Sequence, residues 1–94
     1  MTQFRVSKII DGDTFEVAEG WEWHGKTGSR VRPTGYNAPE LHTAAGQLAK
    51  QKLTRLIQGE IVSFGEAYRI DRGRIVCVVY YNGRNLADYF REYQ

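Results

Sequence analysis

The chain has 94 residues, of which 41% are hydrophobic and 26% charged, so its composition excludes disordered, collagen-like and low-complexity proteins. At this length we expect one domain with a single core, over residues 1–94, and no room for two. The net charge of +2 is too small to establish a polyanionic partner, but nine of the thirteen cationic residues are arginines, whose guanidinium groups bind phosphate or carboxylate through two parallel donors.

A pair of strands is predicted at the start of the chain. Phe4, Val6 and Ile10 alternate with polar neighbours, as in a strand with one buried face. The alternation stops at residues 11–13, where Asp-Gly-Asp is typical of a turn, and resumes from Phe15. We therefore expect a strand, a turn that carries two carboxylates, and a second strand.

A third strand is predicted after a second turn. Residues 24–28 contain two glycines and indicate a chain reversal, and residues 29–32 follow as a strand. Pro33 lacks a backbone donor, so this strand ends there or lies at a sheet edge. Trp21 and Trp23 are typical of barrel or hairpin aromatics, with base stacking as the alternative interpretation.

The period changes to that of a helix between residues 44 and 57. At 100° per residue the apolar side chains fall on one arc, and Lys52 is the exception on that face. Gly59 is well placed as the left-handed residue that ends the helix. The predicted buried face consists of Ala45, Leu48, Ala49, Leu53, Leu56 and Ile57.

The last part of the chain predicts two more strands, over residues 60–64 and 74–81, and the second is apolar on both faces, as in a central strand. Residues 82–83 form an Asn-Gly turn, and Asn85 can cap a short helix. The side chains on one side of that helix are Leu86, Tyr89, Phe90 and Tyr93. This order predicts a mostly β protein, a five-stranded OB-type barrel with a helix between strands three and four, a fold that often binds nucleic acid.

Cysteine content and hydropathy indicate a cytoplasmic protein. Cys77 is the one cysteine, so no internal disulfide can form, and its apolar surroundings predict a buried thiol. The first residues predict a strand and lack the apolar segment of a secretion signal. No apolar stretch approaches the roughly 18 residues that span a bilayer, so we expect no membrane partner.

Two carboxylates at the first turn are candidate metal ligands. Asp11 and Asp13 could hold a hard cation such as calcium through oxygen. Asp-Gly is also one of the commonest turn dipeptides, so a plain turn is the alternative. His24 and His42 are isolated from any further histidine or cysteine at ligand spacing, which argues against zinc.

Further candidates follow the third strand. Arg30 and Arg32 lie on one strand face, and residues 37–40, Asn-Ala-Pro-Glu, come shortly after. The alternative is an exposed strand face and a helix entrance, where a turn suits Asn37 and the helix dipole suits Glu40.

The segments together, in this order, closely resemble the staphylococcal nuclease (thermonuclease) family. The most specific part is Asp-Gly-Asp-Thr, followed by arginine and Pro-Glu at family-like spacing. The resembling segments span nearly the whole chain and are residues 8–15, 30–32, 38–40, 71–74 and 80–86.

This resemblance implies a calcium-dependent nuclease that hydrolyses phosphodiester bonds of DNA or RNA. The implied roles are calcium binding by Asp11, Asp13 and Asn37, catalysis by Arg32, Glu40 and Arg74, and substrate binding by Arg30 and Arg72. Calcium would orient and polarise the phosphodiester, and a carboxylate would help water attack it.

Three features differ from the family pattern. Asn37 stands where the family has aspartate, the loop at 71–74 is one residue shorter and lacks a nucleotide-packing tyrosine, and the chain ends at Gln94, soon after the last predicted helix. A non-catalytic OB-type module that binds nucleic acid or protein is therefore the alternative function. A structural domain that dimerises through its last helix is a third hypothesis, and a monomer is expected otherwise.

Overall fold

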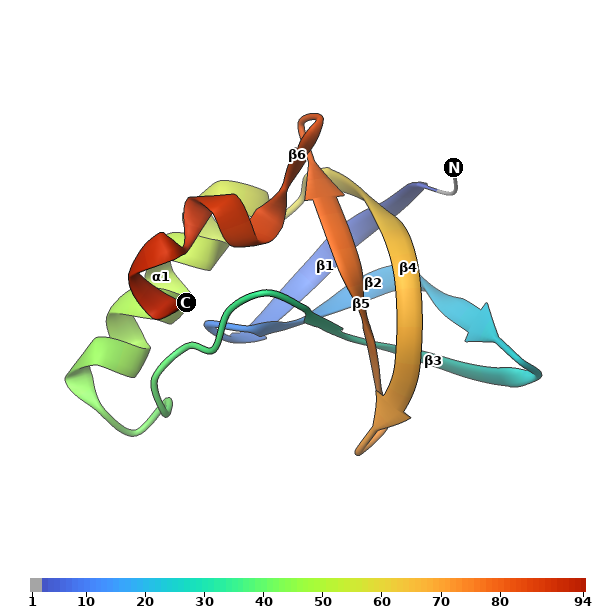
Figure 1. Cartoon of the computed structure of the whole chain (residues 1–94), viewed down its shortest axis with the longest axis horizontal. Helices are drawn as coiled ribbons and strands as arrows, with labels where there is room; N and C mark the ends of the chain where they lie inside the picture. The colour runs from blue at the N-terminus through green and yellow to red at the C-terminus, as the bar shows by residue number, and fades with distance from the viewer. Residues whose placement is uncertain (1–2) are drawn as a thin grey trace.

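The computed structural model describes residues 3–94, which form a mixed barrel of five long strands, extended by the two-residue strand β6, with one α-helix (Figure 1). The strand order is β3-β2-β1-β4-β5-β6, and a parallel pairing between β3 and β5 closes the barrel. The elements are β1 (Gln3–Asp11), β2 (Thr14–Trp23), β3 (Lys26–Pro33), α1 (Ala44–Ile57), β4 (Ile61–Asp71), β5 (Arg74–Tyr81), the two-residue β6 (Arg84–Asn85) and the 3-10 turns η1 (Leu86–Tyr89) and η2 (Arg91–Tyr93). The predicted fold class is confirmed.

Bulges in β1 decide which of its residues face the core. The register of β1 against β2 shifts between Val6 and Lys8 and again between Ile9 and Asp11. A bulge inserts a residue and reverses the side-chain alternation beyond it. Val6 and Ile9 are therefore buried, while Ile10 is only half-buried. The prediction that Ile10 shares the inner face with Val6 is wrong for this reason.

Two strands are longer than the sequence pattern indicated. The β2–β3 turn consists of residues 24–25 alone, both at positive φ, so β3 begins at Lys26 rather than at residue 29. β4 does not end at Phe64 but continues to Asp71. Its register against β5 shifts twice between Phe64 and Arg69, which breaks the alternation on which the prediction relied.

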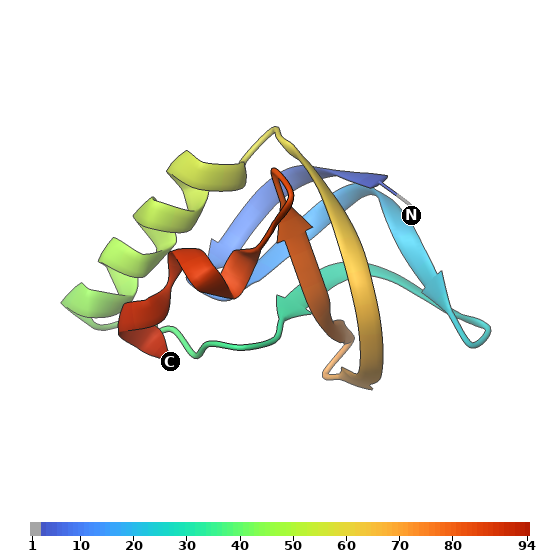
Figure 2. The ribbon, with the colours of Figure 1, turned by 45° about the horizontal axis from the view of Figure 1, so that its top comes forward.

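The helix α1 lies along one side of the barrel (Figure 2). The Oγ1 of Thr43 accepts a hydrogen bond from the Gly46 N–H at 3.0 Å and caps the helix start. Gly59, at φ 79°, follows the helix end as predicted. Ala45 and Leu48 were predicted on the buried face but are exposed, Leu48 by 62%, because the contact with the barrel is a narrow stripe. The buried residues of the helix are Gly46, Ala49, Leu53 and Ile57.

Lys52 joins α1 to the C-terminal turns, which explains a cation on the apolar face. Its Nζ donates to the Tyr89 carbonyl oxygen and to the Glu92 carboxylate, the latter at 2.8 Å, and lies 4.6 Å from the centre of the Phe90 ring. The predicted last helix is instead two 3-10 turns, because the backbone of Phe90, at φ −127°, interrupts the helical conformation. The N–H of Phe90 donates to the Ala87 carbonyl, which closes the first turn.

The barrel interior contains one continuous group of buried side chains, with Phe15, Val31, Leu53 and Phe90 fully buried. Cys77 belongs to this core, and burial raises the pKa of its thiol to about 12, as expected for a packed side chain rather than a reactive one. None of the helices within residues 3–94 has the length and hydrophobicity to cross a lipid bilayer.

Candidate functional site

The acidic turn between β1 and β2 is held against the helix. Its Asp11 side chain accepts a hydrogen bond from the Asp13 N–H at 3.0 Å, an arrangement that is common in tight turns. Gly12 is buried, and an added Cβ would come within 2.6 Å of the Cβ atoms of Ala38 and Ala49. Glycine is therefore required here for the turn to approach both α1 and the loop that precedes it.

The loop after β3 is fastened to the same turn. The buried Tyr36 hydroxyl donates to the Gly12 carbonyl oxygen at 2.8 Å, and the Ala38 N–H donates to Asp13 Oδ2 at 3.0 Å. Burial raises the pKa of Tyr36, so its hydroxyl keeps its proton and remains a donor. The Tyr36 ring stacks on Phe90 with 4.5 Å between centroids, which ties the loop to the C-terminal turns. Two segments that are far apart in the chain are thus held together by these hydrogen bonds.

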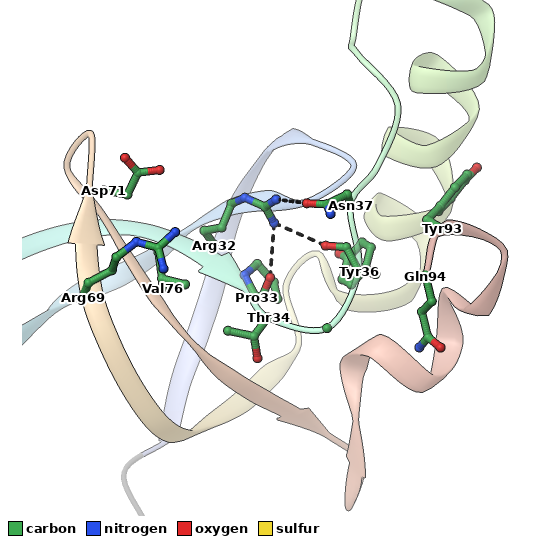
Figure 3. Close-up of a pocket in the computed structure, with 11 residues that line it drawn as sticks. Arg32, Pro33, Thr34, Tyr36, Asn37, Arg69, Asp71, Val76, Tyr93 and Gln94 are labelled. Atoms are coloured by element: carbon green, nitrogen blue, oxygen red, sulfur yellow. Dashed lines mark hydrogen bonds between the residues drawn. The ribbon is translucent and has the colours of Figure 1, made fainter.

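Arg32 is the centre of the polar contacts in this region (Figure 3). One guanidinium nitrogen lies 3.5 Å from Asp13 Oδ2 and donates to the carbonyl oxygens of Pro33 and Tyr36, and the other donates to Asn37 Oδ1. The Arg32 side chain is 21% exposed and that of Asp13 only 14%. The structure therefore brings together an arginine, a carboxylate and an amide that were predicted as site residues.

Asp13 is electrostatically unusual among these groups. Burial and the neighbouring Asp11 side chain raise the pKa of the Asp13 carboxyl above its ordinary value, although the Ala38 N–H and the Arg32 guanidinium act in the opposite direction. A carboxylate that is disfavoured in its charged form and adjacent to a second carboxylate would be stabilised by a cation nearby.

Arg74 reaches the acidic turn from the barrel's closing strand. Its guanidinium donates to Thr14 Oγ1 at 3.3 Å and to the Asp71 carboxylate at 3.0 Å. The parallel pairing of β3 with β5 places Arg74 opposite Arg30. Arg74 therefore contacts the residue next to Asp13, and the strand pairing places it on the same face of the sheet as Arg30 and Arg32.

The other three predicted residues are less closely connected to this group. Arg30 pairs with Glu16 at 3.3 Å and is 53% exposed, and Arg72 is exposed at the tip of the β4–β5 turn with φ 55°. Glu40 is exposed in the loop before α1. Within residues 3–94 its side chain forms no hydrogen bond or ion pair, while its carbonyl oxygen accepts from the N–H and Oγ1 of Thr43.

An open hollow of about 370 Å³ adjoins Arg32 and Asn37. It is bounded by β3, the loop after it, β4, β5 and the C-terminal residues (Figure 3). Arg69, Tyr93 and Gln94 line it and were not predicted from the sequence as site residues. Arg69 was missed because β4 was predicted to end five residues before it. Tyr93 and Gln94 lie at the hollow because the end of the chain contacts the loop after β3, where the Asn37 N–H donates to the Tyr93 carbonyl oxygen at 3.0 Å. The sequence carries no local signal for this contact.

The packing of Gly46 against Glu40 leads to a first prediction. An alanine Cβ at Gly46 would overlap the Glu40 carbonyl oxygen, which is backbone and cannot turn aside. We expect Gly46→Ala to destabilise the protein by about 1 to 3 kcal/mol, although a helical glycine-to-alanine change ordinarily stabilises. Urea unfolding measures the difference. The exposed neighbour provides the control, since Ala45→Gly should cost only about 1 kcal/mol through propensity. A stabilised Gly46→Ala protein would show that the loop is not packed as described.

Comparison with known proteins shows a similarity to an endonuclease. No protein-family model matches this chain. The chain is similar to an uncharacterized endonuclease of Haemophilus influenzae (strain ATCC 51907 / DSM 11121 / KW20 / Rd), with 33% identity over 82 residues. The similar region covers 87% of this chain and 44% of that protein, so the chain spans less than half the length of the relative that it matches.

Proposed function

We propose that this chain is a metal-dependent nuclease that hydrolyses phosphodiester bonds of DNA or RNA, with Ca²⁺ as its metal. The observation that carries the proposal is the convergence of Asp13, Arg32 and Asn37 from the first turn, the third strand and the following loop. The endonuclease relative supports nuclease activity, and the resemblance to the thermonuclease family is what suggests the metal.

The donor atoms near the acidic turn fit a hard cation in type. Asp11, Asp13 and Asn37 offer two carboxylates and one amide oxygen, and calcium binds oxygen ligands almost exclusively. Within the described part of the chain, no three acidic, histidine or cysteine side chains come together as a metal site. Water would therefore complete the coordination shell of the ion. When bound, the cation would orient and polarise the phosphodiester.

The chain's own residues would divide the remaining work. Arg32 and Arg74 would bind the phosphate, and their donors would stabilise the dianionic five-coordinate state more than the monoanionic diester, an effect worth about 10² to 10³ in rate for a well-aimed donor. Glu40, whose side chain forms no hydrogen bond or ion pair with residues 3–94, would accept a proton from the attacking water. Arg30 and Arg72 are proposed to contact the substrate farther from the reacting phosphate.

The first experiment measures cleavage of single-stranded DNA and RNA by the pure protein, with calcium and with a chelator. The proposal is supported if the cleavage activity depends on calcium and elutes together with the protein. Binding of either nucleic acid with no cleavage at any calcium concentration would contradict it and would indicate a non-catalytic binding module instead.

Asn37→Asp tests the metal site separately. The change replaces a neutral oxygen with a charged one beside Arg32 and Asp13, and affinity for calcium rises with ligand charge. We expect calcium to bind about tenfold more tightly, measured by calorimetry, and cleavage to saturate at lower calcium. Asn82→Asp is the matched control, because Asn82 is exposed on the β5–β6 turn at φ 56°, a conformation that aspartate tolerates. Equal calcium affinity for both variants and the wild type would remove Asn37 from the ligand set.

A further inference from the structure

Three neighbouring strands place two arginines in one row on the outside of the barrel. Arg32 of β3 pairs with Val76 of β5, and Val76 pairs in turn with Arg69 of β4. Residues that pair across strands point to the same face, whereas Val31 and Ile75, their chain neighbours, point into the core. Two strand spacings of about 4.8 Å each separate the two arginine backbones. The row therefore faces the hollow that all three of its members line (Figure 3).

The two arginines of the row differ in how they are neutralised. Arg32 is paired with Asp13, and Asp71, the one side-chain carboxylate among the described residues that line the hollow, is paired with Arg74. The Arg69 side chain is exposed and forms no hydrogen bond or ion pair with any residue in the described range 3–94. An anion entering the hollow would therefore meet an uncompensated guanidinium at Arg69.

We infer that Arg69 binds a second phosphate of the substrate, beside the phosphate held by Arg32 and Arg74, so that the site prefers a strand with adjacent phosphates to an isolated phosphodiester. The inference rests on the proposed function for the first phosphate. Its own support is the register Arg32–Val76–Arg69, the shared hollow and the absence of a carboxylate partner for Arg69 among residues 3–94.

The test compares Arg69→Gln with Arg55→Gln. Arg55 is exposed on α1, outside the hollow, so its variant loses the same charge elsewhere. Binding of a fluorescent single-stranded oligonucleotide is measured by anisotropy in chelator at several salt concentrations. Each phosphate contact contributes about 0.7 to the slope of log affinity against log salt for single strands. We expect the slope to fall by about that amount in Arg69→Gln and to stay at the wild-type value in Arg55→Gln.

Kinetics with two substrates give a second readout. Arg69→Gln should raise KM for an oligonucleotide about five- to tenfold with kcat unchanged, because the contact is remote from the reacting phosphate. It should leave KM unchanged for a nitrophenyl phosphodiester of thymidine, which carries one phosphate. An unchanged salt slope in Arg69→Gln, or an equal rise in KM for both substrates, would overturn the inference, as would a wild-type protein that binds no oligonucleotide. A reduced slope in a protein that cleaves neither substrate would support the inference while the proposed hydrolysis failed.

Discussion

Glu40→Gln is expected to lower kcat for single-stranded DNA by about 10² to 10⁴, because glutamine cannot take a proton from water. The same change should leave folding intact. The Glu40 side chain is exposed and has no hydrogen bond or ion pair within residues 3–94, and substitutions at such positions usually change stability by less than about 0.5 kcal/mol. Loss of activity in a stable protein would therefore report on chemistry.

The control for this variant is Glu19→Gln, which removes a carboxylate from an exposed position on β2, outside the candidate site. It should cleave at the wild-type rate. Calcium binding by both variants is measured by calorimetry, so that a lost metal is not mistaken for a lost base. A kcat for Glu40→Gln within a few-fold of the wild-type value would exclude Glu40 as the general base and transfer that role to another group.

Phe90→Ala is expected to lower the free energy of unfolding by about 3 to 5 kcal/mol, a large part of the 5 to 15 kcal/mol typical of a domain. The Phe90 side chain is completely buried, stacks on Tyr36, and lies beneath the ammonium group of Lys52. Alanine would leave a cavity between the C-terminal turns, α1 and the loop after β3. Urea denaturation followed by circular dichroism measures the loss.

The effect should extend to the candidate site, because the ring that stacks on Phe90 also carries the hydroxyl that holds the Gly12 carbonyl. Phe90→Leu, which keeps most of the volume, should lose much less stability and retain activity. If Phe90→Ala unfolded within about 1 kcal/mol of the wild type, the turns would not be packed as the structure describes. In that case, Phe90→Ala would give no support to the idea that the C-terminal turns help to position the residues of the candidate site.

Element type and order were predictable because they depend on local periodicity. The alternation at Phe4 and Val6, the 100° arc of α1 and the apolar run of β5 each carry their own signal. The errors arose where tertiary pairing overrides that signal. A bulge in β1 places Ile9 rather than Ile10 on the inner face, and the narrow contact of α1 with the barrel leaves Leu48 exposed to solvent. Neither a bulge nor the width of a contact can be deduced from one strand or helix considered alone.

The candidate site divides in the same way. Asp13, Arg32 and Asn37 could be grouped from the sequence through a resemblance that covers most of the chain, and the structure brings these three together. Arg69 could not be included, because its place beside Arg32 depends on the β3–β5 pairing that closes the barrel and on the shifted register of β4. Such pairings join residues far apart in the chain and leave no trace in local sequence.

A calcium titration followed by backbone amide chemical shifts tests most directly whether the converging residues form one ion site. We predict that the shifts are largest at residues 11–14 and at Asn37, Ala38 and Glu40, and that they saturate together with a single affinity, because the ion would displace the Arg32 guanidinium from Asp13 and Asn37. Shifts centred on other acidic positions, such as Glu60 or Asp88, or no shifts at millimolar calcium, would contradict this account.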